Sequence, residues 1–241
     1  MTSKPQSRVQ RAEILVQLFD RRVAAFELRG RALESDLHPS ELRSVSSAVA
    51  ARRLEFAGGR LCARAALTEL GAPERPLLVG PGREPLWPDA LVGSISHTAG
   101  YCGAVAASTW DYRAIGIDVE VRGELTGALE DQVCTPAEIR WLDSQPTERR
   151  TELATIIFSA KEAFYKCQFC VTASWLDFHD VTIEVCPGEF AVSPSGRNSA
   201  LLSLRTPLSG RYHLGAEHVF TGIGIAGTDG DSSEPGGAPT A

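Results

Sequence analysis

The sequence predicts a mixed α/β fold in which a long helix followed by short strands occurs twice. Helical signals cover residues 40–70 and 148–170, and short apolar runs bounded by Gly and Pro follow each of them. The chain has 241 residues, of which 43% are hydrophobic. It can therefore bury a substantial core, either as one large domain or as two small halves packed together.

The first long helix is predicted from its start and stop signals. Ser40 is the expected cap, and Gly71 followed by Pro73 is the expected stop. Gly58-Gly59 is a candidate break in the middle of the helix.

The second helix, at residues 148–170, is predicted because its apolar residues recur at helical spacing. Between residues 115 and 121, apolar side chains alternate with Gly116, Asp118 and Glu120, which indicates a half-buried strand with one polar face. Further strands are predicted at residues 77–79, 91–96, 102–108, 181–185, 200–204 and 219–226.

Composition excludes several classes of protein. The net charge of −6 makes nucleic acid a poor partner, and no run approaches the roughly 20 apolar residues of a membrane helix. The first residues lack the apolar stretch of a secretory signal, so a cytoplasmic protein is expected. Residues 1–38 carry no clear structural signal, and residues 227–241, rich in Gly, Pro and Ser, are predicted to be disordered.

The six cysteines are too sparse for a disulfide scaffold, so reduced thiols are expected. Cys167 and Cys170 form a C-x-x-C within the second predicted helix. Because there is no second such pair and the motif lies within a predicted helix, ordinary half-buried cysteines are favoured over a zinc or redox site.

Asp118 and Glu120 are the first candidate site residues. Because they are two apart on a strand, their side chains leave the same face about 6.5 Å apart. A carboxylate pair without nearby histidines suits Mg²⁺ better than zinc. Taken alone, the pair is better explained by an ordinary solvent-exposed acidic strand face.

The second predicted helix adds Lys161, Glu162 and Lys166. An exposed ion pair would explain these residues alone. Together with the strand pair, Glu162 would be a third carboxylate at a cation, and the lysines would neutralise phosphate charge or protonate a leaving group. The combination indicates phosphoryl chemistry.

Ser96 and His97 end a predicted strand and are compatible with three interpretations. A serine hydrolase is disfavoured because the G-x-S-x-G elbow is absent. A hydroxyl and an imidazole at a strand end can instead bind phosphate oxygens, or simply form a capped turn. Arg52, Arg60 and Arg64 lie eight and four residues apart, so they are expected near one face of the first long helix.

Four motifs in this order resemble the signatures of the phosphopantetheinyl transferase family: REPLWP (83–88), GSISHT (93–98), GIDVE (116–120) and FSAKEAFYK (158–166). The resemblance spans roughly residues 48–166. It is to the larger, pseudodimeric branch, which includes the surfactin-type, enterobactin-type and actinobacterial enzymes.

The resemblance implies two similar α/β halves related by a pseudo-twofold, each a small sheet packed on a long helix, with coenzyme A in the cleft between them. The expected divisions are residues 1–112 for the N-terminal half, 113–226 for the C-terminal half with the metal site, and 227–241 for the tail. The implied reaction transfers 4′-phosphopantetheine from coenzyme A to a serine of an apo carrier protein and releases adenosine 3′,5′-bisphosphate.

The resemblance also implies roles for individual residues. Asp118, Glu120 and Glu162 would hold Mg²⁺, and Glu162 or a water on the metal would take the serine proton. The other implied roles are the phosphate contacts of Lys161, Lys166, Ser96 and His97, the 3′-phosphate contacts of Arg52 and Arg60, and the assistance of Lys166 to the leaving bisphosphate. At Gly82-Arg83 the order of Gly and basic residue is reversed relative to relatives, which puts the nucleotide contact of Arg83 in doubt.

The implied partners are acyl or peptidyl carrier proteins of polyketide, nonribosomal peptide or fatty-acid synthesis. The enzyme itself is expected to be a monomer. The carrier would dock on residues 124–145, which include Val133, Ile139, Trp141 and Leu142. Two rival functions are a different metal-dependent phosphoryl enzyme, such as a phosphatase, and a noncatalytic module that binds coenzyme A.

Overall fold

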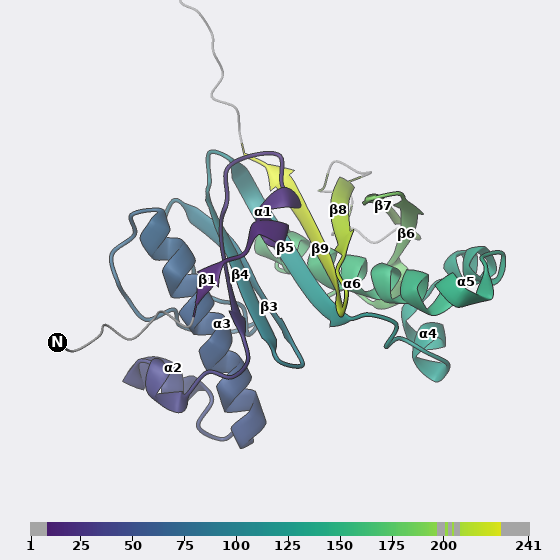
Figure 1. Cartoon of the computed structure of the whole chain (residues 1–241). Coiled ribbons are helices and arrows are strands. Elements are labelled where there is room, and N and C mark those ends of the chain that lie inside the picture. The colour runs from purple at the N-terminus through teal and green to yellow at the C-terminus, as the bar shows by residue number, and fades with distance from the viewer. Residues whose placement is uncertain (1–8, 197–200, 202–203, 205–207, 228–241) are drawn as a thin grey trace, which may run out of the picture.

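The computed structural model describes residues 9–196, 201, 204 and 208–227. A four-stranded and a five-stranded sheet lie side by side, and each is packed on one long helix (Figure 1). The predicted mixed α/β fold with two similar halves is therefore confirmed. In the described part of the chain, no helix combines the length and apolar character needed to cross a membrane.

The N-terminal sheet has the strand order β1-β2-β4-β3, and every pairing in it is antiparallel. Helix α3 (Ala50–Glu69) covers it, and the apolar face of the helix forms a core with β2 and β4. The other elements of this half are β1 (Gln10–Arg11), α1 (Glu13–Gln17), β2 (Ala24–Arg29), η1 (Glu34–Asp36), α2 (Pro39–Ser44), β3 (Leu91–Thr98) and β4 (Tyr101–Ser108).

The C-terminal sheet has the strand order β5-β9-β8-β7-β6, again antiparallel, and packs on α6 (Thr147–Thr172). The second predicted helix is thus confirmed. The other elements are β5 (Tyr112–Val121), α4 (Ala128–Val133), α5 (Pro136–Asp143), η2 (Phe178–Asp180), β6 (Val181–Cys186), β7 (Glu189–Pro194), β8 (Leu208–Leu214) and β9 (His218–Ala226).

The two sheets meet where β3 lies against β5, and two serines of β3 join them. The Ser94 hydroxyl accepts a hydrogen bond from the Ile117 N–H at 3.0 Å, and the Ser96 hydroxyl accepts one from the Val119 N–H at 3.1 Å. These side chains satisfy backbone donors of β5 that a neighbouring strand would otherwise bind. The polar face of β5 is thereby fixed against β3, which sets the position of the site described below.

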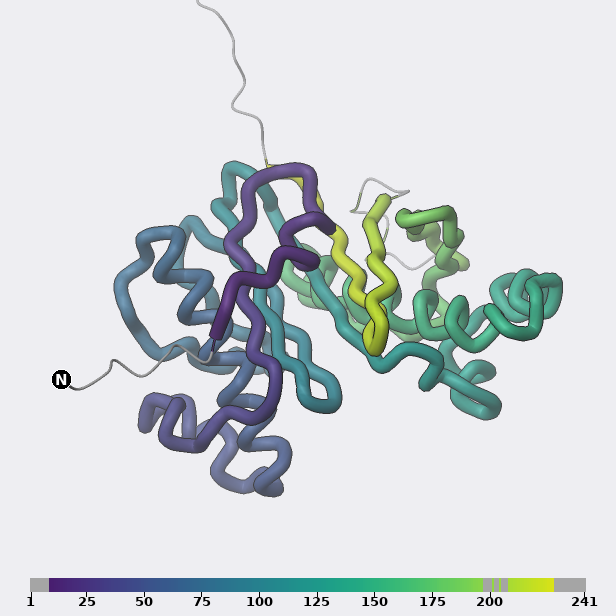
Figure 2. The backbone as a smooth tube through the Cα atoms, in the orientation of Figure 1, coloured from purple at the N-terminus to yellow at the C-terminus, as the bar shows by residue number. Residues whose placement is uncertain are grey.

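The N-terminal segment, for which the sequence gives no clear signal, also joins the halves. After β1 the chain turns through α1 beside β9 and returns as β2 (Figure 2). Leu15 and Leu18 of this segment are buried in a core cluster with Ile117 of β5 and Phe220 of β9. The segment therefore supplies part of the core between the two halves.

The first predicted helix is wrong in three details. It is interrupted at residues 45–49, which separate α2 from α3. Its cap is His38, whose N–H binds the Glu41 carboxylate, so Ser40 lies inside the helix. Gly58-Gly59 does not break α3, which continues through both residues. A Cβ at either position would overlap Cys102 or Ile95. The two glycines instead let the helix approach the sheet closely.

Two predicted strands also need correction. Residues 77–79 form only an isolated bridge between Val79 and Pro85. The strand predicted at residues 200–204 lies mostly outside the described residues, and its described members, Leu201 and Leu204, are buried without strand structure. The tail predicted at residues 227–241 lies, apart from Gly227, outside the described residues too.

Gly116 of β5 allows helix α6 to pack against the strand, and a substitution there tests this packing. A Cβ at this position would overlap the Ala163 carbonyl oxygen and crowd the Cys167 N–H. Both are helix backbone atoms that cannot rotate away, so we expect Gly116→Ala to lower the free energy of unfolding by about 1–3 kcal/mol. Urea unfolding would measure this loss. Gly196→Ala, where no atom lies within 4 Å of the added Cβ, should cost much less, and equal losses would contradict the packing argument.

Candidate active site

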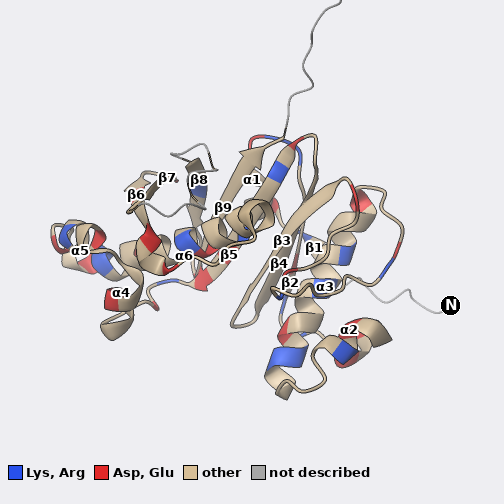
Figure 3. Cartoon of the chain, turned by 180° about the vertical axis from the view of Figure 1, so that it is seen from behind, with Lys and Arg blue, Asp and Glu red and all other residues tan. Residues whose placement is uncertain are grey.

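A cleft of about 640 Å³ lies at the junction of the two halves. Its walls come from α3, the loop before β3, the strands β3 and β5, helix α6 and the residues after it. Nine of the ten site residues expected from the sequence line it: Arg52, Arg60, Arg83, Ser96, His97, Asp118, Glu120, Glu162 and Lys166. Figure 3 marks basic residues along α3 and acidic residues at one end of β5, on opposite sides of this junction.

Asp118 is the most buried carboxylate of the cleft. Its Oδ1 accepts hydrogen bonds from the Ser96 hydroxyl at 2.9 Å and from the Lys166 ammonium at 2.6 Å. Its Oδ2 is buried and has no hydrogen-bond partner among the residues that the structure describes. A buried carboxylate oxygen without a partner is costly, so this atom is suited to bind a further cation or donor.

Glu120 and Glu162 lie near Asp118. Burial and the negative charges of Asp118 and Glu162 raise the pKa of Glu120 to about 8, against the opposing effect of Lys166. Burial also raises the pKa of Glu162, and the charge of Asp118 adds to the rise while Lys166 again opposes it. The three carboxylates therefore repel one another in a partly dry site with one nearby ammonium.

This donor set fits a hard divalent cation. Within the described residues, no three His, Cys, Asp or Glu side chains are close enough to enclose an ion by themselves. Mg²⁺ does not need such a cage, because it binds through one or two carboxylates plus waters and substrate phosphates. Such an ion would give the unpartnered Asp118 oxygen a partner and would offset the negative charge crowded around Glu120.

Lys166 is held at the centre of the cleft by α6. Besides Asp118, its ammonium donates to the Ile117 carbonyl at 3.2 Å and to the Ser96 hydroxyl at 3.4 Å. It lies four positions after Glu162, so both side chains project from the same face of the helix. The helix thereby presents a carboxyl group and an ammonium group to β5, one helical turn apart.

His97 follows Ser96 at the end of β3 and meets α3. Its Nε2 contacts the Arg52 guanidinium, and its Nδ1 lies 3.8 Å from Glu55. Burial, together with the positive charge of Arg52, lowers the pKa of His97. The imidazole is therefore neutral at pH 7 and is a hydrogen-bonding group rather than a cation.

The remaining arginines differ from one another in burial and in the groups they contact. Arg60 is buried, donates to the Leu77 carbonyl at 2.8 Å and stacks on Phe56. Arg83 is exposed at the cleft with a positive φ of 68°. Arg64, expected on the same face as Arg60, is not part of the cleft, because it pairs with Glu41 of α2 at 2.7 Å.

Comparison with known proteins decides the family. The model of the 4′-phosphopantetheinyl transferase N-terminal domain matches residues 39–107, and that of the 4′-phosphopantetheinyl transferase superfamily matches residues 114–216. The 4′-phosphopantetheinyl transferase Npt of Nocardia iowensis is 40% identical over 202 residues, which cover 78% of this chain and 89% of Npt. The chain belongs to the 4′-phosphopantetheinyl transferase family.

Other relatives agree with this assignment. The 4′-phosphopantetheinyl transferase Svp of Streptomyces mobaraensis is 36% identical over 208 residues, or 82% of each chain. The 4′-phosphopantetheinyl transferase PptT of Mycobacterium tuberculosis is 42% identical over 146 residues, which cover 60% of this chain and 63% of PptT. The chain is accordingly an enzyme that transfers phosphopantetheine from coenzyme A to carrier proteins. The family assignment favours this function over the phosphatase and binding-module alternatives.

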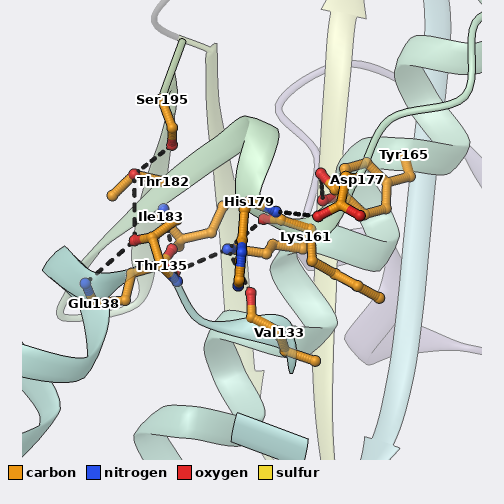
Figure 4. Close-up of polar contacts among 11 residues, drawn as sticks. Val133, Thr135, Glu138, Lys161, Tyr165, Asp177, His179, Thr182, Ile183 and Ser195 are labelled. Carbon is orange, nitrogen blue, oxygen red and sulfur yellow. Dashed lines mark hydrogen bonds and ion pairs between the residues drawn. The ribbon is translucent and has the colours of Figure 1, made fainter. Parts of the chain in front are cut away.

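Lys161 is the one expected site residue of this phosphopantetheinyl transferase that lies elsewhere, so its predicted phosphate contact is wrong. Its side chain is fully buried and pairs with Glu138 of α5 at 2.8 Å (Figure 4). Lys161 and Lys166 are five positions apart, which places them roughly 140° apart around a helix. This spacing could by itself have predicted that the two lysine side chains lie in different surroundings.

The cleft also has an apolar end that the sequence did not indicate. It is formed by aromatic and aliphatic side chains at the end of α6 and just after it: Tyr165, Phe169, Trp175, Leu176 and Phe178. Trp175 is 76% exposed, and its ring lies 5.2 Å from that of Phe169, centroid to centroid. Residues 173–177 form no regular element before η2, so no periodicity in the sequence predicts this wall.

All six cysteines lie in the described part of the chain and are free thiols. Cys167 is fully buried under β5, whereas Cys170 lies at the cleft. Burial raises the pKa of both thiols, which makes them poor nucleophiles.

The segment expected to receive the carrier protein, residues 124–145, forms α4 and α5. Val133 and Leu142, named for that contact, are buried in the C-terminal core and cannot contact a partner. Ile139 and Trp141 are only partly buried. Among the large apolar side chains of this segment, Leu129 of α4 is exposed, at 52%.

Proposed function

We propose that the cleft binds coenzyme A, and the three kinds of side chain that line it carry this proposal. Arginines of α3, carboxylates with Lys166 at the β3–β5 junction, and aromatic side chains at the end of α6 and after it all face one cleft. Coenzyme A has a 3′-phosphate, a pyrophosphate and a pantetheine arm, which these three groups would bind in turn. The apolar end would take the pantetheine arm.

In this arrangement Asp118, Glu120 and Glu162 would hold Mg²⁺. The unpartnered Asp118 oxygen and the raised pKa of Glu120 support this assignment. When bound, the ion would neutralise negative charge on the pyrophosphate. Lys166 would move from Asp118 to the phosphates, since its flexible stem carries the ammonium over several ångströms.

The transfer itself uses two side chains of α6. Glu162 takes the proton of the carrier serine as the serine oxygen forms its bond to the β-phosphorus of the pyrophosphate. The bond from that phosphorus to the bridging oxygen breaks, and adenosine 3′,5′-bisphosphate leaves with Lys166 balancing its developing charge. Positioning and charge neutralisation are the main contributions that phosphoryl transfer needs.

The other predicted residues would bind the substrate. Ser96 and His97 would hydrogen-bond the phosphates, while Arg52 and Arg60 would contact the 3′-phosphate and Arg83 the nucleotide from the exposed loop. Arg60 is preorganised by its stacking on Phe56, which limits the entropy lost on binding.

Both halves line the cleft, so we assign the activity to a monomer. We divide its two halves between residues 112 and 113, just after the first residue of β5. The acceptor would be an acyl or peptidyl carrier protein of polyketide, nonribosomal peptide or fatty-acid synthesis. It would approach over α4 and α5, where Leu129 offers an exposed apolar contact.

The intact mass of an apo carrier protein, incubated with this chain, coenzyme A and Mg²⁺, tests the proposal. A gain of one phosphopantetheine arm that a chelator abolishes would support it. An arm gained equally in the presence of chelator would reject the metal assignment. No gain on carriers of the three pathway types would reject the acceptor assignment.

The 3′-phosphate contact gives a separate prediction. We expect Arg52→Gln to raise the KM for coenzyme A about 10–100-fold, since it removes a charged hydrogen bond worth about 1.5–3 kcal/mol, and to leave the KM for 3′-dephospho-coenzyme A nearly unchanged. Arg53→Gln is the matched control, because Arg53 binds Glu34 and the Ala48 carbonyl outside the cleft. Equal losses with both substrates would contradict the assignment of Arg52.

A further inference from the structure

Lys161 uses all of its hydrogen-bonding capacity inside the protein. Its ammonium donates to the Glu138 carboxylate and the Val133 carbonyl, both at 2.8 Å (Figure 4). It also donates to the Phe178 carbonyl at 2.7 Å. An ammonium has three N–H donors. None is left for a substrate phosphate, and the side chain is fully buried.

Glu138 extends these contacts to two further segments. One of its oxygens accepts the Ile183 N–H of β6 at 2.6 Å, and the other accepts the Thr135 N–H, also at 2.6 Å, which begins α5. The carboxylate is 2% exposed. The pair formed by Lys161 and Glu138, called here the buried pair, therefore binds the end of α4, the start of α5, strand β6 and η2.

The contact with η2 reaches the cleft. Phe178, whose carbonyl Lys161 binds, lines the apolar end, and its ring lies 5.4 Å from that of Tyr165. Tyr165 donates its hydroxyl to the Asp177 carbonyl at 2.9 Å, and the Asp177 carboxylate accepts the His179 N–H at 3.0 Å. Residues 175–178, called here the apolar wall, are thus held to α6 by two of its side chains, Lys161 and Tyr165.

Stability alone is a weak reason for such a pair. Replacing a buried ion pair by apolar residues is often neutral or stabilising, whereas directional bonds fix one arrangement of the groups they join. Here the groups joined are a catalytic helix and an irregular segment that has no strand or helix of its own before η2.

We infer that the buried pair of Lys161 and Glu138 positions the apolar wall that receives the pantetheine arm of coenzyme A. Lys161 is then a positioning residue, one residue before Glu162 but on another face of α6. The inference rests on the proposed function, because it assumes that this wall contacts the pantetheine arm.

Calorimetric titration of the full chain with two ligands, each in the presence of Mg²⁺, tests the inference. Coenzyme A carries the pantetheine arm, whereas adenosine 3′-phosphate 5′-diphosphate has the same 3′-phosphate and pyrophosphate without that arm. For Lys161→Met we expect the Kd of coenzyme A to rise at least about tenfold, because misplaced binding groups lose affinity steeply, and the Kd of the ligand without the arm to stay within about twofold. Equal weakening of both ligands would indicate a phosphate contact by Lys161 and would overturn the inference.

Arg150→Met is the matched control. Arg150 lies on the same helix and pairs with Glu130 of α4 and Asp143 of α5 rather than with residues 175–178. We expect it to leave both Kd values unchanged. A Lys161→Met protein that only melts at a lower temperature, with both Kd values intact, would show a purely structural role and would also overturn the inference.

If Lys161→Met does not fold, Glu138→Gln decides. The amide oxygen can still accept one backbone N–H but attracts the ammonium less strongly, so we expect the same split between the ligands with a smaller change, about threefold or more. No split would reject the inference. If the unsubstituted protein itself does not bind coenzyme A, the proposed function fails instead, which separates the two outcomes.

Discussion

Glu162→Gln is expected to lower kcat for phosphopantetheine transfer by about 10²–10⁴-fold, the usual contribution of a positioned general base. The amide has nearly the same shape but cannot take the serine proton. Because Asp118 and Glu120 remain, binding of coenzyme A should weaken far less than the rate falls. Single-turnover transfer to an apo carrier, followed by intact mass, measures the chemical step directly.

The control for this variant is Glu148→Gln. Glu148 lies in the first turn of α6, exposed and outside the cleft, so its amide should transfer at the normal rate. A Glu162→Gln protein with full activity would move the proton acceptor elsewhere. It would leave the family assignment intact, because that assignment rests on the whole length of the matched chain.

Asp118→Asn should change the dependence on Mg²⁺ most strongly. The amide keeps an oxygen that can accept the bonds from Ser96 and Lys166, so the junction of β3 and β5 is preserved. It removes the negative charge that the cation needs. We expect the Mg²⁺ concentration for half-maximal rate to rise about 10–100-fold or more, since even residues that only support a metal ligand have effects of this size.

Rates measured across a Mg²⁺ series test this expectation. Asp131→Asn, an exposed residue of α4, is the control and should follow the unsubstituted curve. A parallel fall in rate at every Mg²⁺ concentration, with an unchanged midpoint, would show that Asp118 acts through Lys166 rather than through the metal.

The two lysines of FSAKEAFYK illustrate how one helix serves two purposes. Lys166 faces β5 and the carboxylates, whereas Lys161 faces α4, α5 and η2. The resemblance to the family assigned phosphate contacts to both. Helical geometry separates them, because five residues turn the helix well past one revolution.

Local pattern determined much of this protein from the sequence alone. The alternation at residues 115–121 placed Asp118 and Glu120 on one face of a strand, and the helical spacing placed Glu162 and Lys166 one turn apart. Both signals are properties of neighbours in the chain, where side-chain direction follows from the backbone period.

Only the tertiary structure decided which of these residues meet. Ser96, Asp118 and Lys166 come from three elements, and their contacts depend on the serine bonds that fix β3 to β5. The apolar wall at residues 175–178 shows no helical or strand periodicity in its sequence, and the buried ammonium of Lys161 binds its Phe178 carbonyl. Such contacts join segments far apart in sequence, so the order of neighbouring residues carries no direct record of them.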